Sequence, residues 1–227
     1  MMKTKEIYIS DNSIAIDLIR KYEYPHMILP NIGSYIIDLG NKLSDDYVLI
    51  GENIWIHKSA NVFASALIIG PCIIDEGAEV RHGAFIRGNV IVGKNSVVGN
   101  SSEIKNAILF DTVQVPHFNY VGDSILGYGS HMGAGSISSN VKSDKTNVVI
   151  KNGKDRIETN LKKVGVFLGD NVEIGCNAVL NPGTIIGPNT SVYPLVSVRG
   201  IIGNNMIVKS MDKIVLKEER LNERNYL

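Results

Sequence analysis

The sequence predicts an all-β chain folded as a parallel β-helix, with short helical caps at its two ends. The main observation is a repeat of aliphatic side chains every six residues. Ile and Val make up under a quarter of the chain, yet every sixth position over a long stretch is one or the other. These positions are Ile56, Val62, Ile68, Ile74, Val80, Ile86, Val92, Val98 and Ile104. A six-residue period fits neither a helix of 3.6 residues per turn nor a simple alternating strand.

A second repeat, four residues further along, holds compact side chains such as Ala60, Ala66, Cys72, Ala78 and Ala84. Gly and Asn accompany both repeats and suit tight turns in which φ is positive. Together the repeats predict a coil with three short flat faces, one hexapeptide to a face, whose aliphatic residues point inward. Coils of this kind stack at the strand spacing of about 4.8 Å.

The repeat also divides the chain. Residues 52–208 carry it and form the predicted β-helix, with slips between 105 and 138. Residues 139–166 have no hexapeptide pattern and are predicted to leave the prism as a loop or hairpin. Residues 1–51 are predicted to be a helical and irregular N-terminal cap, and residues 209–227 a C-terminal tail with helical character.

Composition excludes several classes of protein. The formal net charge is zero, so the basic surface typical of a nucleic-acid binder is missing. The chain has no apolar run suited to a secretory signal or a membrane span, so we expect a cytoplasmic protein without a membrane partner. Two cysteines, Cys72 and Cys176, are too few for a disulfide framework or a thiolate zinc site.

The segment PHFNYVGDSILGYGSHMGAGSISSN, residues 116–140, contains a His-x-x-Tyr-x-Gly-Asp element inside the hexapeptide array. With AFIRGNVIVG and SSEIKNA before it and KKVGVFLGDNVEIGCNAVLNPGTIIG after it, it resembles the acetyltransferase half of the bifunctional enzyme that makes UDP-N-acetylglucosamine. Bacterial and archaeal sugar-1-phosphate acetyltransferases are the most similar members, and the resemblance covers roughly residues 52–205.

The resemblance implies a left-handed coil, a homotrimer with active sites between prisms, and acetyl-CoA as co-substrate, with no metal needed for acetyl transfer. The implied reaction is N-acetylation of a hexosamine-1-phosphate. The nucleotidyltransferase domain of the longer relatives is not expected here, because only about 50 residues precede the solenoid.

By the same resemblance, His117 is the general base, since an imidazole with a pKa near 6.5 accepts a proton at neutral pH. Arg87 and Lys105 match the residues that bind the sugar phosphate. Tyr120 and Asn140 match residues that contact the substrate. Lys145 lies nearest to a substrate-binding lysine, one residue out of register.

Three positions correspond to acetyl-CoA contacts. The backbone N–H of Ala134 matches the group that meets the acetyl carbonyl and would stabilise its developing negative charge. Cys176 matches a residue beside the pantetheine arm, and Lys209 is a candidate for the CoA phosphates.

Two departures from the family leave the sugar open. His131 stands where bacterial members have an asparagine, and Val141 replaces a tyrosine. Glucosamine-1-phosphate and galactosamine-1-phosphate therefore both stay candidates, as does another amino-sugar acceptor. A non-catalytic scaffold is a further alternative. A γ-class carbonic anhydrase shares the fold, but its His-x-x-x-x-His pair is missing around His117.

Overall fold

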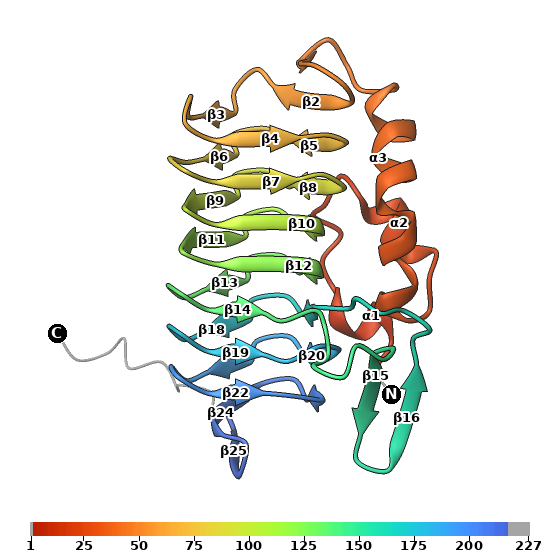
Figure 1. Cartoon of the computed structure of the whole chain (residues 1–227), viewed down its shortest axis with the longest axis vertical. Coiled ribbons are helices and arrows are strands. Elements are labelled where there is room, and N and C mark those ends of the chain that lie inside the picture. Colours follow the sequence, from red (N-terminus) through yellow and green to blue (C-terminus); the bar gives the residue numbers. More distant parts are fainter. Residues whose placement is uncertain (1, 218–227) are drawn as a thin grey trace, which may run out of the picture.

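The computed structural model describes residues 2–217, and these form a parallel β-helix with three faces (Figure 1). The first face consists of β4 (Leu67–Ile69), β7 (Phe85–Arg87), the first halves of β10 (Glu103–Leu109) and β12 (Tyr120–Leu126), β14 (Ile137–Ser138), β19 (Val179–Leu180) and β22 (Ser197–Val198). The second face consists of β2 (Ile54–His57), β5 (Cys72–Ile74), β8 (Val90–Val92), the second halves of β10 and β12, β17 (Val166–Leu168), β20 (Thr184–Ile186) and β23 (Ile201–Ile202). The third face consists of β3 (Asn61–Val62), β6 (Glu79–Val80), β9 (Val97–Asn100), β11 (Gln114–His117), β13 (His131–Met132), β18 (Glu173–Ile174), β21 (Ser191–Val192) and β24 (Met206–Ser210).

The predicted hexapeptide repeat is confirmed as the inner lining of this prism. Ile74, Val80 and Ile86, one from each face in succession, are all 0% exposed. Many corners between faces are turned by asparagines with positive φ, among them Asn95 and Asn177. Asparagine tolerates this left-handed region because its short polar side chain can hydrogen-bond locally.

The slips between residues 105 and 138 have a structural cause. In the coil above, Gly88 and Asn89 separate the first-face strand β7 from the second-face strand β8. In the next two coils a single residue turns this corner, Asn106 in β10 and Asp123 in β12, each with positive φ. Glu103 therefore pairs with Tyr120 after 17 residues, and Tyr120 pairs with Ile137 after another 17.

The N-terminal segment lies along the side of the prism, which corrects the prediction that residues 1–51 cap an open end. Its elements are α1 (Thr4–Ile7), α2 (Ile16–Arg20), the 3₁₀ turns η1 (Pro25–Met27) and η2 (Leu29–Asn31), and α3 (Ile32–Gly40). These elements run beside the second face in Figure 1, and α3 contacts β5, β8 and β10. Tyr8 stacks on Phe110 with ring centroids 5.1 Å apart and donates a hydrogen bond to the Ile125 carbonyl.

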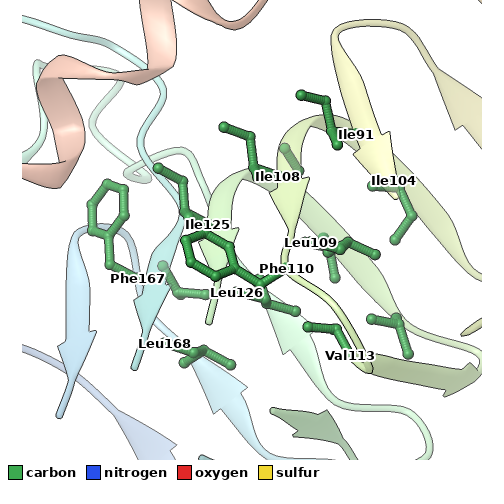
Figure 2. Packing of buried hydrophobic residues seen from close by; sticks show 14 of the residues in the cluster. Ile91, Ile104, Ile108, Leu109, Phe110, Val113, Ile125, Leu126, Phe167 and Leu168 are labelled. Carbon is green, nitrogen blue, oxygen red and sulfur yellow. The ribbon is translucent and has the colours of Figure 1, made fainter. Parts of the chain in front are cut away.

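Cover by this segment explains why the second-face strands are apolar on both sides. Ile91 and Ile108 point outward from strands whose inner residues are also aliphatic, and both are 0% exposed. Figure 2 shows these side chains with Ile125 and Phe167 near the helical segment. After α3, β1 (Tyr47–Leu49) pairs antiparallel with β2 and leads into the first coil.

Two hairpins leave the regular coil. The inserted hairpin consists of β15 (Val149–Asn152) and β16 (Asp155–Glu158), and it falls inside the segment 139–166 that the sequence set apart. At the C-terminal end, β25 (Lys213–Leu216) pairs antiparallel with β24, so residues 209–217 are a strand hairpin where helical character was predicted. Residues 218–227 of that predicted tail lie outside the described residues. None of the described helices, the longest of which has nine residues, could cross a membrane.

Candidate functional site

His117 stands at the corner where the third face turns into the first. It ends β11, and Phe118 follows with a φ of 53°. The corner is fixed by Asn119, whose buried side chain accepts a hydrogen bond from the His117 N–H at 3.0 Å and donates to the Gly133 and Ser136 carbonyls. His117 itself is exposed, and no side chain within residues 2–217 hydrogen-bonds its imidazole. The backbone is therefore held while the ring stays available.

The positions predicted to contact acetyl-CoA follow His117 down the same corner. The Gly135 N–H donates to the His117 carbonyl at 3.0 Å, and the Asn177 N–H donates to the Ala134 carbonyl at 2.9 Å. Ala134 and the exposed Cys176 thus occupy the next two coils below His117. We call His117, Ala134 and Cys176 the corner column.

Two features of the corner column bear on acyl transfer. Within the described residues the Ala134 N–H has no hydrogen-bond acceptor, so it is a free donor one coil from the imidazole. Further along, Lys209 lies 6.0 Å from the centroid of the Tyr193 ring, and Tyr193 is hydrogen-bonded to Val208. Lys209 therefore lies beyond Cys176, towards the end of the prism.

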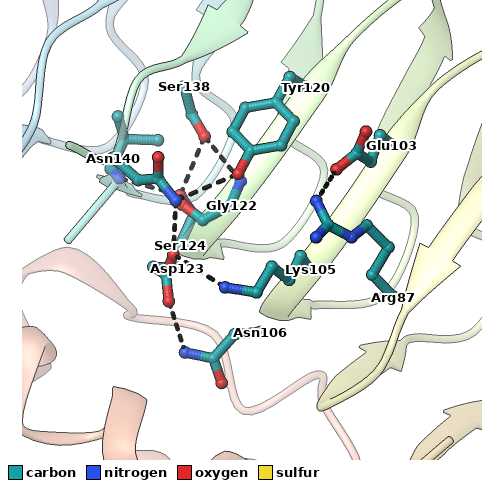
Figure 3. A network of polar contacts seen from close by, with 11 residues as sticks. Arg87, Glu103, Lys105, Asn106, Tyr120, Gly122, Asp123, Ser124, Ser138 and Asn140 are labelled. Atoms are coloured by element: carbon teal, nitrogen blue, oxygen red, sulfur yellow. Dashed lines mark hydrogen bonds and ion pairs between the residues drawn. The ribbon is translucent and has the colours of Figure 1, made fainter. Parts of the chain in front are cut away.

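The predicted substrate residues lie on the first face. Register places Arg87 beside Lys105, and Lys105 beside Gly122, in one outward row of successive coils. Arg87 forms an ion pair with Glu103 at 2.5 Å, as Figure 3 shows. Tyr120 follows Glu103 in the neighbouring outward row, nearer to the corner column.

Asp123 connects the remaining polar residues of the first face. This carboxylate is 5% exposed and accepts hydrogen bonds from Asn106 Nδ2 at 2.9 Å and from Asn140 Nδ2 at 2.6 Å. Lys105 Nζ lies 3.9 Å from it. Asn140 also donates to the Tyr120 hydroxyl at 3.1 Å. Figure 3 shows these side chains converging on the corner that Asp123 turns.

The surroundings of Tyr120 keep its phenol neutral. Burial is the main cause of a raised Tyr120 pKa, and the negative charge of Asp123 adds to it. Because Asn140 occupies the oxygen as an acceptor, the phenolic O–H remains free to donate. Gly122 makes this position possible, since a Cβ there would lie 2.4 Å from the Tyr120 hydroxyl oxygen.

No described side-chain contact joins Lys145, a predicted substrate residue, to this cluster. Lys145 lies in the loop after Asn140, has a φ of 57°, and makes no side-chain contact with Tyr120 or Asn140 among the described hydrogen bonds and ion pairs. Of the two departures from the family, His131 lies on the third face, and Val141 directly follows Asn140. His131 pairs with Glu173 at 2.9 Å on the third face, and Val141 is 42% exposed.

Sequence reasoning missed Asp123, Glu103 and Asn106. Asp123 closes the His-x-x-Tyr-x-Gly-Asp element, so the motif itself contained the signal. Glu103 and Asn106 flank Lys105 and become visible only when adjacent coils are set in register. Among the described residues there is no group of three or more His, Cys, Asp or Glu placed to hold a metal ion.

Comparison with known proteins gives two family matches. Residues 68–154 match the GMPPB C-terminal domain, and residues 165–200 match the bacterial transferase hexapeptide family of six repeats. The hexapeptide match agrees with the predicted left-handed β-helix.

Curated relatives match over about a third to a half of this chain. A bifunctional GlmU protein from Methanococcus maripaludis is 33% identical over 117 residues, which is 52% of this chain and 28% of the relative. The GlmU protein of Methanocaldococcus jannaschii is 34% identical over 115 residues, 51% of this chain and 28% of the relative. A bifunctional sugar-1-phosphate nucleotidylyltransferase/acetyltransferase from Sulfurisphaera tokodaii is 31% identical over 79 residues, 35% of this chain and 20% of the relative. The matched part of this chain thus spans under a third of the length of these relatives.

Among solved structures, a variant of GDP-perosamine N-acetyl transferase from Caulobacter crescentus with CoA and GDP-perosamine is 19% identical, with a TM-score of 0.33, over 73% of this chain and 57% of that one. The polysialic acid-specific acetyltransferase NeuO is 13% identical, with a TM-score of 0.45, over 77% of this chain and 92% of that one.

Proposed function

We propose that this chain, a homologue of the C-terminal acetyltransferase half of GlmU, transfers an acetyl group from acetyl-CoA to the amino group of a hexosamine-1-phosphate. One observation carries the proposal beyond homology. The corner column presents a free imidazole and a free backbone N–H in successive coils, beside a face that carries two cations and a neutral phenol.

In this reaction His117 takes a proton from the amine as its nitrogen attacks the thioester carbon. The N–C bond forms, and the negative charge that develops on the carbonyl oxygen is met by the Ala134 N–H. The C–S bond then breaks, and the proton held by His117 passes to the departing CoA thiolate. A hydrogen-bond donor that is fixed before the reaction needs no reorganisation during it, and the Asn119 contacts hold this corner in place.

Arg87 and Lys105 supply the charge for the sugar phosphate. In the structure each has a carboxylate partner, Glu103 at 2.5 Å and Asp123 at 3.9 Å. The Glu103 side chain is 33% exposed, so a phosphate can replace it on the Arg87 guanidinium, which binds two oxygens at once. The buried Asp123 stays with Asn140 and holds Tyr120 and Asn140 towards the sugar.

Acetyl-CoA would run along the corner column, with Cys176 beside the pantetheine arm and Lys209 near the phosphates. Exposed apolar side chains lie beside the corner column, including Phe118, Ile137, Val179 and Leu195. An exposed apolar patch of this kind favours self-association, which supports a homotrimer in which neighbouring prisms enclose the corner column between them. A cytoplasmic location stays a prediction from the sequence.

The deciding experiment measures release of the CoA thiol from acetyl-CoA with glucosamine-1-phosphate and with galactosamine-1-phosphate. We expect His117→Ala to lower kcat at least about a hundredfold, the usual loss for a general base. His82→Ala is the matched control, because His82 lies at the same corner two coils earlier and hydrogen-bonds Ser65. It should stay within about twofold of the parent.

The outcomes separate the alternatives. Thiol release with one sugar phosphate alone identifies the sugar. Acetyl-CoA binding without thiol release from either sugar phosphate would mean that the acceptor is another amine. If the chain does not bind acetyl-CoA, the result would favour the non-catalytic scaffold.

A further inference from the structure

A cleft of about 650 Å³ lies between the inserted hairpin and the last coils of the prism. Its residues come from the loop before the hairpin, from β15, and from the corners near Asn181 and Arg199. This volume is typical of small-molecule sites, which range from about 300 to 1,000 Å³. No residue assigned above to His117 chemistry or to acetyl-CoA lines it.

The charge of the cleft is one-sided. Lys142, Lys151 and Arg199 line it, and no carboxylate does. Lys142 is paired with Asp144 at 3.2 Å, whereas neither Lys151 nor Arg199 forms an ion pair with any described residue. Arg199 has only a long contact with Asn181 at 3.5 Å. These two unpaired cations favour an anionic ligand.

Two cations elsewhere on the prism surface show the contrasting, locally neutralised arrangement. Arg81 pairs with Glu79 at 2.8 Å, and Lys94 pairs with Glu76 at 3.0 Å. Lys151 and Arg199 differ from Arg81 and Lys94 in having no carboxylate partner among the described residues.

Arg199 lies away from the proposed sugar-phosphate cations, although the cleft reaches Ser139 and Val141 on either side of Asn140. Register places Arg199 in the same outward row as Lys105, but four coils further along the prism. At about 4.8 Å per coil the separation is about 19 Å, too far for one sugar phosphate to bridge. The corner column lies at the other edge of the first face. A phosphate held by Arg199 is therefore not the sugar phosphate held by Lys105.

We propose that this cleft binds the pyrophosphate of a nucleotide. The Arg199 guanidinium would hold one phosphate through paired N–H donors, and Lys151 would neutralise the other as a point charge. No aromatic side chain lines the cleft, so recognition rests on the phosphates and not on stacking of the base. Two sources share this chemistry: a nucleoside diphosphate, free or linked to a sugar, and the CoA held by a neighbouring copy of the chain.

Isothermal titration of the full chain with UDP and, separately, with CoA tests this proposal. Lys151→Gln and Arg199→Gln should each raise the Kd of one of these probes at least about tenfold. Lys154→Gln is the control, because Lys154 is exposed in the turn of the same hairpin and does not line the cleft. It should change the Kd less than about twofold. Melting curves of each variant check that the fold is intact.

The probe that responds identifies the source. An effect on UDP points to a nucleoside diphosphate, and an effect on CoA alone points to the phosphates of a neighbour's CoA. The proposal is overturned if neither probe binds at millimolar concentration, or if Lys154→Gln weakens binding as much as the two cleft variants. His117→Ala should bind the responding probe as the parent does, so failure of acetyl transfer and failure of this site are distinguishable.

Discussion

Two buried aspartates at the two corners of the second face show how one fold separates chemistry from stability. Asp123 and Asp170 are each 5% exposed, and each turns or adjoins a corner of a coil. Asp123 borders the first face, which we call the open side, and it contacts the side chains of Asn106, Asn140 and Lys105. Asp170 lies where the N-terminal segment packs on the second face, which we call the covered side. It accepts hydrogen bonds from backbone N–H groups alone.

The partners determine what each aspartate can do. Backbone N–H groups at Ile9, Ser10 and Tyr128 fasten the N-terminal segment to the coils, at 2.9, 2.7 and 3.1 Å from the Asp170 carboxylate. Side-chain groups have freedom to reorient, so an aspartate that fixes them can aim them at a ligand. Asp170 therefore anchors the N-terminal segment to the prism, whereas Asp123 positions side chains for a ligand.

The largest expected effect is on stability, at the covered side. Asp170→Ala leaves three N–H groups without their charged acceptor and should lower the free energy of unfolding by about 3 kcal/mol. Because the N-terminal segment does not border the corner column, kcat/KM for acetyl transfer should stay within about threefold at 25 °C. Chemical denaturation monitored by circular dichroism measures the first quantity. A large loss of activity in a fully folded variant would contradict the separation of the two sides.

Asp123→Asn should produce the opposite result. Asparagine suits the positive φ at this corner, but its amide cannot accept from both Asn106 and Asn140 and also balance Lys105. We expect kcat/KM to fall about a hundredfold, which corresponds to about 2.7 kcal/mol.

Asp111→Asn is the control for this substitution. Asp111 is a half-buried corner aspartate outside the first face and accepts one hydrogen bond, from the Lys94 N–H. Its kcat/KM should stay close to the parent value. If Asp123→Asn keeps full activity, Asp123 does not position Tyr120 and Asn140.

A smaller effect is expected from Arg87→Gln. Loss of this cation should raise the KM for the sugar phosphate about tenfold and leave kcat within about threefold, because the phosphate is bound in both ground and transition states. Arg81→Gln breaks an ion pair of the same kind on the third face, with Glu79 at 2.8 Å, and should leave KM unchanged. Equal effects from both variants would indicate general electrostatics and not a phosphate site.

The open side was largely predictable from sequence, because inner and outer residues alternate there. The six-residue repeat identified the inner residues, and the motif from His117 to Asn140 selected side chains that the structure places on the first face and at its two corners. The exception is Lys145, which register alone cannot place because it lies in an inserted loop.

The covered side was missed for a physical reason. Its strands have aliphatic residues on both surfaces, as in Ile73-Ile74 and Ile91-Val92, and this doublet recurs once per coil. When every third hexapeptide has an aliphatic residue pointing outward as well as one pointing inward, the face they form is expected to be covered by another segment. The short helices of the N-terminal segment supply that cover, so they lie along the prism and not across its end. No local pattern within residues 1–51 contains that information.

The two free cysteines should differ in reactivity, because Cys72 is buried on the covered side and Cys176 is exposed. Cys72 lies in β5 under the N-terminal segment, and burial raises its pKa to about 12. At pH 8 roughly one molecule in ten thousand would carry its thiolate, which is the reactive form. Cys176 is exposed on the corner column.

Iodoacetamide should therefore modify one thiol per folded chain, at Cys176, and two after denaturation, as mass spectrometry would show. Bound CoA should slow the modification of Cys176 severalfold, whereas labelling that CoA does not affect would place the pantetheine arm away from this column.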